Sequence, residues 1–149
     1  MKKFLKRNYT IIILFLLTIS VSLFNSFTFT IDVPATDLGG LFTAAFILLW
    51  IAALFISMHK THVMVFSIIF WSVFAITSIL RLSFDTGDLP IIVSRFFSFS
   101  LRIFYSSLYG VTRWLNNANI PIITLLTSII FIAISIIFLR KGRCKLYKL

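Results

Sequence analysis

The fold of this chain depends on residues Leu89–Leu115, which read LPIIVSRFFSFSLRIFYSSLYGVTRWL. The stretch is long and apolar enough to cross a membrane, but it contains Arg95, Arg102 and Arg113. At about 100° per residue, these arginines fall on one stripe of a helix. An arginine at the bilayer centre costs about 2.5–3.5 kcal/mol on the insertion scale. We therefore predict an amphipathic interfacial helix over about 89–115 in place of a fifth crossing. A partly re-entrant course for this helix remains an alternative.

The arginine stripe is the best candidate for a binding site in the sequence. The planar guanidinium of arginine binds phosphate and carboxylate groups through two parallel hydrogen bonds. Two tyrosines lie near the stripe, which suits the interface between lipid and water. An anionic headgroup or a membrane partner would then bind at Arg95, Arg102, Arg113, Tyr105 and Tyr109. Pairing of these arginines with aspartates of the same surface, or simple anchoring at the interface, are the alternatives.

The composition places the chain in a membrane. The sequence is 60% hydrophobic and 12% charged over 149 residues. A typical soluble domain is about 45–50% apolar and about 25% charged. In water, such a chain would expose large apolar patches, which favour aggregation. We predict a single all-α integral membrane domain over 1–149, without a linker or an internal repeat.

Four stretches have the roughly 20 apolar residues that a membrane-spanning helix needs. They cover about 9–29, 41–58, 63–80 and 120–139. The basic start before the first stretch is also typical of a cleaved secretory signal. Bulky phenylalanines occupy the end of that stretch, where a cleavage site would need small residues, so we expect a retained helix. The loop between the first two spans contains Pro34, Gly39 and Gly40, which are residues typical of turns.

The charged residues predict the orientation. The acidic residues Asp32, Asp37, Asp85 and Asp88 fall in two loops, whereas both ends of the chain are rich in lysine and arginine. Basic residues flank spans preferentially on the cytoplasmic side. We therefore predict an antiparallel four-helix bundle with both termini and Lys60 in the cytoplasm. The content of isoleucine and phenylalanine fits a bacterial inner or cytoplasmic membrane.

Small and hydroxylated residues recur on one face of each predicted span. In lipid, such faces allow helices to pack closely and to form interhelical hydrogen bonds. The residues are Thr18, Ser22 and Asn25 in the first span, Gly40, Ala44 and Ala52 in the second, Ser67, Trp71, Ala75 and Ser78 in the third, and Thr124, Ser128 and Ser135 in the last. The alternative is a polar pathway through an oligomer. No ionisable residue lies at the centre of a predicted span, which disfavours proton-coupled transport.

Several other functions lack the residues they need. The net charge of +10 comes from basic residues at span ends, so nucleic acid is not an expected partner. His59 and His62 have no neighbouring carboxylate or thiolate to complete a metal site. The single Cys144 excludes an internal disulfide. The sequence contains neither Gly-x-Ser-x-Gly nor His-Glu-x-x-His. We predict no catalytic residue, metal or cofactor.

The sequence thus favours a small multi-pass protein of the cell membrane that acts as a non-enzymatic interaction or accessory protein. In size and layout it is comparable to small immunity proteins, without a shared motif. The expected partners are anionic membrane lipids, another membrane protein or a second copy of the chain, bound through the outward-facing helix. One alternative is an oligomeric channel or transporter that uses the hydroxyl-lined faces. Another is a lipid-modifying enzyme that uses Asp85 and Asp88.

Overall fold

The computed structural model describes residues 2–31, 34–83, 101–115 and 119–146. All regular structure in these residues is helical. Four helices are long and apolar enough to cross a membrane, as the sequence predicts. They are α1 (Lys2–Thr30), α2 (Asp37–Ile56), α3 (Thr61–Ser83) and α6 (Ile120–Leu146).

Helix α2 begins earlier than its predicted start at residue 41. Thr36 has extended backbone angles, and its Oγ1 accepts a hydrogen bond of 3.2 Å from the Gly39 backbone N–H. This is an N-cap, which satisfies one of the free amide groups in the first helical turn. Asp37 in the same turn is favourable for the helix dipole. The cap therefore brings Gly39 and Gly40 into the helix, although such residues are typical of turns.

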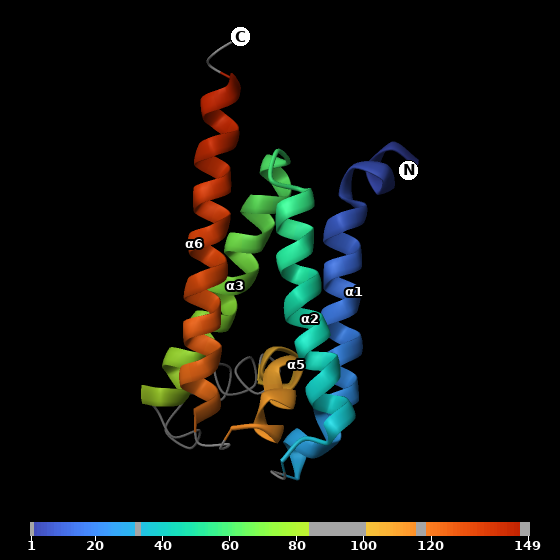
Figure 1. The fold of residues 1–149 in the computed structure, drawn as a ribbon, viewed down its shortest axis with the longest axis vertical. Helices are drawn as coiled ribbons and strands as arrows, with labels where there is room; N and C mark the ends of the chain where they lie inside the picture. Colours follow the sequence, from blue (N-terminus) through green and yellow to red (C-terminus); the bar gives the residue numbers. More distant parts are fainter. Residues whose placement is uncertain (1, 32–33, 84–100, 116–118, 147–149) are drawn as a thin grey trace, which may run out of the picture.

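The helices alternate in direction between two ends of the molecule (Figure 1). The start of α1, the turn between α2 and α3, and the last residues of α6 lie at one end, which we call the terminal end. The end of α1 and the starts of α2 and α6 lie at the other, which we call the loop end. At the terminal end, the Lys60 backbone N–H donates to the Ser57 carbonyl over 2.8 Å and closes the predicted tight turn.

An aromatic cluster forms the core where α2, α3 and α6 meet. The Trp71 ring stacks on Phe131 with ring centroids 4.3 Å apart and an interplanar angle of 3°. Trp50 meets Trp71 edge to face at 5.4 Å. Trp50 and Trp71 are both fully buried. Offset-stacked and edge-to-face pairs are the favoured aromatic geometries, so the cluster holds these three helices together.

Residues 101–113 form a short segment with three kinds of helical winding. It consists of a π-helical turn η1 (Leu101–Tyr105), an α-helical turn α5 (Ser106–Tyr109) and a 3₁₀ turn η2 (Gly110–Arg113). The sequence predicts one regular amphipathic helix over 89–115, of which 89–100 lie outside the described residues. Within the described part the prediction needs correction, because residues 105–110 are all buried. An arginine stripe calculated at a constant 100° per residue does not apply to a segment whose winding changes twice.

The predicted packing faces of the four spans are largely confirmed. The polar members of these faces are buried, including Thr18, Asn25, Ser67 and Ser128. The exception is Ala52, which is exposed. Small and hydroxylated residues therefore mark helix contacts in this chain, except toward the terminal end of α2.

Candidate functional site

A chain of buried hydrogen bonds connects α1, α2 and α5 near the loop end. Asn25 Nδ2 donates to Thr43 Oγ1 over 3.1 Å, and Thr43 Oγ1 donates to the Ser107 carbonyl over 3.0 Å. Asn25 is 1% exposed, and Thr43 and Ser107 are fully buried. A polar group buried without a partner is costly. The bonds therefore hold three separate parts of the chain in one arrangement.

A second buried contact joins α1 to the start of the segment. Ser22 Oγ lies 2.6 Å from Ser106 Oγ and 2.9 Å from the Arg102 carbonyl oxygen. Ser106 Oγ is also in hydrogen-bond contact with the same carbonyl. The two hydroxyl protons can therefore serve one bond between the serines and one bond to the carbonyl. Hydroxyls that bind a helix carbonyl disturb the regular ladder, and η1 lies at this position.

The segment runs along α1 and α2 rather than across their ends (Figure 1). Moving toward the loop end, its residues meet α1 progressively later and α2 progressively earlier in the sequence. The contacts are Ser106 with Ser22, Tyr109 with Phe29, Ser107 with Thr43, and Arg113 with Asp37. The segment therefore extends from a point beside Ser22, in the last third of α1, out to the loop end.

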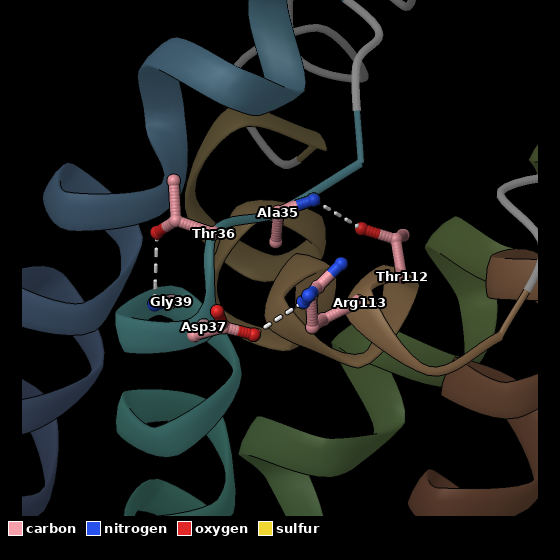
Figure 2. A network of polar contacts seen from close by, with 6 residues as sticks. All are labelled: Ala35, Thr36, Asp37, Gly39, Thr112 and Arg113. Atoms are coloured by element: carbon pink, nitrogen blue, oxygen red, sulfur yellow. Dashed lines mark hydrogen bonds and ion pairs between the residues drawn. The ribbon is translucent and has the colours of Figure 1, made fainter.

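Figure 2 shows how the far end of the segment is fixed to the start of α2. The Ala35 backbone N–H donates to Thr112 Oγ1 over 2.8 Å. Arg113 Nε donates to the Asp37 carboxylate in an ion pair at the surface. Pairing with an aspartate was one of the alternatives for the arginines, and Arg113 adopts it with Asp37.

Glycines allow the segment to approach α2 closely. A Cβ atom added to Gly110 would overlap the Gly39 carbonyl oxygen and Thr43 Oγ1. A Cβ added to Gly40 would lie 2.8 Å from the Trp114 ring, which therefore rests against this part of α2. Trp114 is nevertheless 58% exposed. The glycines thus set the distance between α2 and the segment and hold a tryptophan at the surface.

The two candidate tyrosines belong to the interior of the protein. Tyr105 is 3% exposed and Tyr109 is 2% exposed. The Tyr109 ring packs edge to face on Phe29 with centroids 5.3 Å apart. The Tyr105 hydroxyl is buried without a hydrogen-bond partner among the described residues. Burial raises the pKa of the Tyr105 phenol, so the ring stays neutral at physiological pH.

The structure separates the five residues of the predicted binding site. Arg102 and Arg113 are exposed, whereas Tyr105 and Tyr109 are buried. Arg95 lies outside the described residues. Arg113 pairs with Asp37, and Arg102 has no ion pair within the described parts of the chain. Arg102 is therefore the candidate whose charge is still available to a ligand.

Sequence reasoning missed the residues that position this site. Thr43, Gly110 and Thr112 carry the contacts described above, and none of them belongs to a predicted packing face. The interior position of Gly110 in a helical stretch was an available signal, since glycine there is unfavourable unless packing requires it. For chemistry beyond binding, the described residues contain no group of three or more histidine, cysteine, aspartate or glutamate side chains able to hold a metal ion.

No family model matches this chain, and no curated protein or solved structure matches it either.

Proposed function

We propose that this chain is a non-enzymatic interaction protein of a cell membrane, with its loop end outward and both termini in the cytoplasm. Its four spans would form an antiparallel bundle in a bacterial inner or cytoplasmic membrane. The segment 101–113 would enter the bundle from the outer side as a re-entrant element. It would present Arg102 to an anionic membrane partner. The observation that carries this proposal is the position of Arg102, which is exposed, lies beside Ser22 of α1 and has no ion pair among the described residues.

The depth of Arg102 supports a binding role. Its backbone contacts Ser22, which precedes the end of α1 at Thr30 by about 12 Å at 1.5 Å per residue. An arginine within the hydrocarbon core is costly unless its guanidinium finds a partner or reaches the interface. A carboxylate or phosphate of a partner would remove this cost and bind the guanidinium bidentately. Such residues are functional candidates for this reason.

The support beneath Arg102 favours specific recognition over simple anchoring. The Arg102 carbonyl is tied to Ser22, and the segment is fixed again at Thr43 and at Asp37. A surface that is already ordered loses little conformational entropy on binding. Trp114 directly follows the segment and is exposed, and tryptophan and arginine are among the residue types most enriched at interface hot spots.

The alternative of a hydroxyl-lined channel receives less support. Most of the hydroxyls that such a pathway would use are engaged inside the chain, as Ser135 Oγ with Ser67 Oγ at 2.9 Å illustrates. Thr124 Oγ1 is the exception, because it has no hydrogen-bond partner among the described residues. Thr43 and Ser22 are used in the same way. A hydroxyl that already has an internal partner contributes little to solvating an ion or solute.

Site-specific photo-crosslinking in native membranes tests the proposal. A photoreactive side chain at position 103, next to Arg102, should give one discrete product with a protein or a phospholipid of defined mass. Arg102→Glu should remove this product, because the reversed charge repels an anionic group. Arg102→Lys should retain part of it, since lysine keeps the charge but not the planar fork.

Two controls separate recognition from proximity. The same probe at Ile129, an exposed residue of α6, should not give this product. Arg140→Glu, an equal charge change at the other end of the molecule, should leave the product unchanged. The proposal is wrong if Ile129 yields the same product, or if Arg102→Glu has no effect in a protein that still inserts.

A further inference from the structure

A cleft opens between α1 and α2 at the terminal end, far from Arg102. Its volume is about 270 Å³, and it is lined by residues of α1 between Tyr9 and Leu17 and of α2 between Leu49 and Ser57. Most of these side chains are aliphatic, and the exposed Ala52 on α2 leaves room that a larger residue would fill. Ala52 was predicted to pack against a helix. It lines this cleft instead, which explains why it is exposed.

The length of the cleft matches one leaflet of a membrane. The lining stretch of each helix rises about 12 Å at 1.5 Å per residue. Half of a typical hydrocarbon core is about 15 Å. Both stretches lie within the helices that are apolar enough to span a membrane. A lipid acyl chain that enters from the terminal end would therefore run along most of the cleft.

A buried hydroxyl without a partner lies among the lining residues. Ser57 is fully buried, and its Oγ has no hydrogen-bond partner among the residues that the structure describes. Its backbone N–H bonds to the Ala53 carbonyl over 3.0 Å, so the chain is well ordered there. Leaving a buried hydroxyl unpaired costs about 1–3 kcal/mol. Because its Oγ has no exposed surface, this hydroxyl is covered by neighbouring groups and does not contact an occupant of the cleft.

A positive charge stands at the mouth of the cleft. Lys60 Nζ donates to the Tyr9 hydroxyl over 3.3 Å and lies 4.8 Å from the centre of the Tyr9 ring. Tyr9 itself lines the cleft. Lys60 follows Ser57 by one turn, so the ammonium group lies farther out than the buried hydroxyl. This order, from apolar groove to cation, matches the order of acyl chain and phosphate in a phospholipid.

We infer that the cleft between α1 and α2 binds one anionic glycerophospholipid of the leaflet at the terminal end. One acyl chain occupies the groove, and Lys60 binds the phosphate. The basic residues before Tyr9, at positions 2, 3, 6 and 7, raise the local concentration of anionic lipid. This site uses different residues from the recognition surface around Arg102 and stands independently of it.

Photoactivatable lipids test the inference on the full-length protein in phosphatidylcholine vesicles. The probe is phosphatidylglycerol with a diazirine in one acyl chain, and the comparison probe is phosphatidylcholine with the same group. Mass spectrometry of the labelled protein should place the phosphatidylglycerol adducts within 9–17 and 49–57. Phosphatidylcholine should label these stretches weakly, because it carries no net charge for Lys60 to attract.

Paired variants then separate charge from shape. Lys60→Gln should reduce groove labelling by phosphatidylglycerol about fivefold, the usual effect of one lysine near an anionic surface. Arg140→Gln removes an equal charge at the same end and should leave labelling unchanged. Ala52→Phe should fill the groove and bring labelling to background, whereas Ala45→Phe, on an exposed α2 residue outside the cleft, should not.

Three results would overturn the inference. The first is adducts spread evenly around the four spans in equal proportion for both lipids, which would indicate boundary lipid only. The second is groove labelling that survives both Lys60→Gln and Ala52→Phe. The third is a disulfide-linked dimer of Ala52→Cys in a Cys144→Ser background without groove labelling, which would assign the cleft to a second copy. Lys60→Gln leaves the groove shape intact, so the test does not depend on the folding of Ala52→Phe.

Discussion

Gly110 is the residue at which the segment 101–113 comes closest to α2. Its backbone is helical, with φ near −55°, so alanine would fit the local conformation. Lack of space excludes alanine, because a Cβ atom at this position would overlap the Gly39 carbonyl and Thr43 Oγ1. Backbone cannot move aside as a flexible side chain can, so the whole segment would have to shift.

We expect Gly110→Ala to lower the free energy of unfolding by about 1–3 kcal/mol, the usual range for overpacking. Alanine normally stabilises a helix relative to glycine by about 1 kcal/mol, so a loss of stability would have the sign opposite to helix propensity. Thermal unfolding in detergent micelles measures the effect. Leu115→Ala, on an exposed residue of the same stretch, is the control and should change little. A melting temperature for Gly110→Ala at or above that of the wild type would contradict the close contact.

At the scale of the element, the segment 101–113 has little regular helix to stabilise it. Its three turns differ in winding, and each is too short to be stable alone. Its position depends on side-chain bonds to α1 and α2, chiefly through Thr43. The element is therefore a product of tertiary contacts more than of its own sequence.

Thr43→Val tests this dependence, because valine keeps the shape and removes the hydroxyl. The substitution leaves the Asn25 amide and the Ser107 carbonyl unpaired, and we expect a loss of about 1–3 kcal/mol. Protease accessibility of residues 101–115 should rise in parallel as the segment detaches. Thr30→Val, at the exposed end of α1, is the matched control. A neutral Thr43→Val would mean that packing alone holds the segment.

At the scale of the whole molecule, the arrangement of ends makes a firm prediction about topology. The start of α1 and the end of α6 lie at the same end of the molecule, so both termini should be on one side of the membrane. An impermeant thiol reagent applied to intact cells should not label the native Cys144. In a Cys144→Ser background, Pro34→Cys at the loop end should be labelled. Labelling of Cys144 from outside in sealed cells, together with protection of Pro34→Cys, would reverse the orientation, and equal labelling of both would refute four crossings.

The four spans and most of their packing faces were predictable from the sequence, whereas the start of α2 and the burial of the tyrosines were not. Long apolar runs bury their backbone polar groups only as helices, so the four spans follow from hydropathy and length alone. The polar packing faces follow from spacing, as the burial of Thr18, Ser67 and Ser128 illustrates. The earlier start of α2 depends on the N-cap at Thr36. The sequence did not predict this start, because Gly39 and Gly40 are residues typical of turns. The burial of Tyr105 and Tyr109 could not be predicted, because a stripe calculated from one helical period assumes one type of helix, whereas this segment contains three.

The sequence by itself determined that this protein has four helices suited to lipid, because the apolar length of each one is a local property. It also predicted that the stretch 89–115 would differ from them, because arginine is costly in hydrocarbon, and residues 101–113 are indeed not one long helix. Only the tertiary structure decided which residues of that stretch are available. Hydroxyls and glycines far apart in the chain bring the segment against α1 and α2, bury Tyr105 and Tyr109, pair Arg113 with Asp37 and leave Arg102 exposed. These outcomes depend on contacts between distant residues, which no local periodicity encodes.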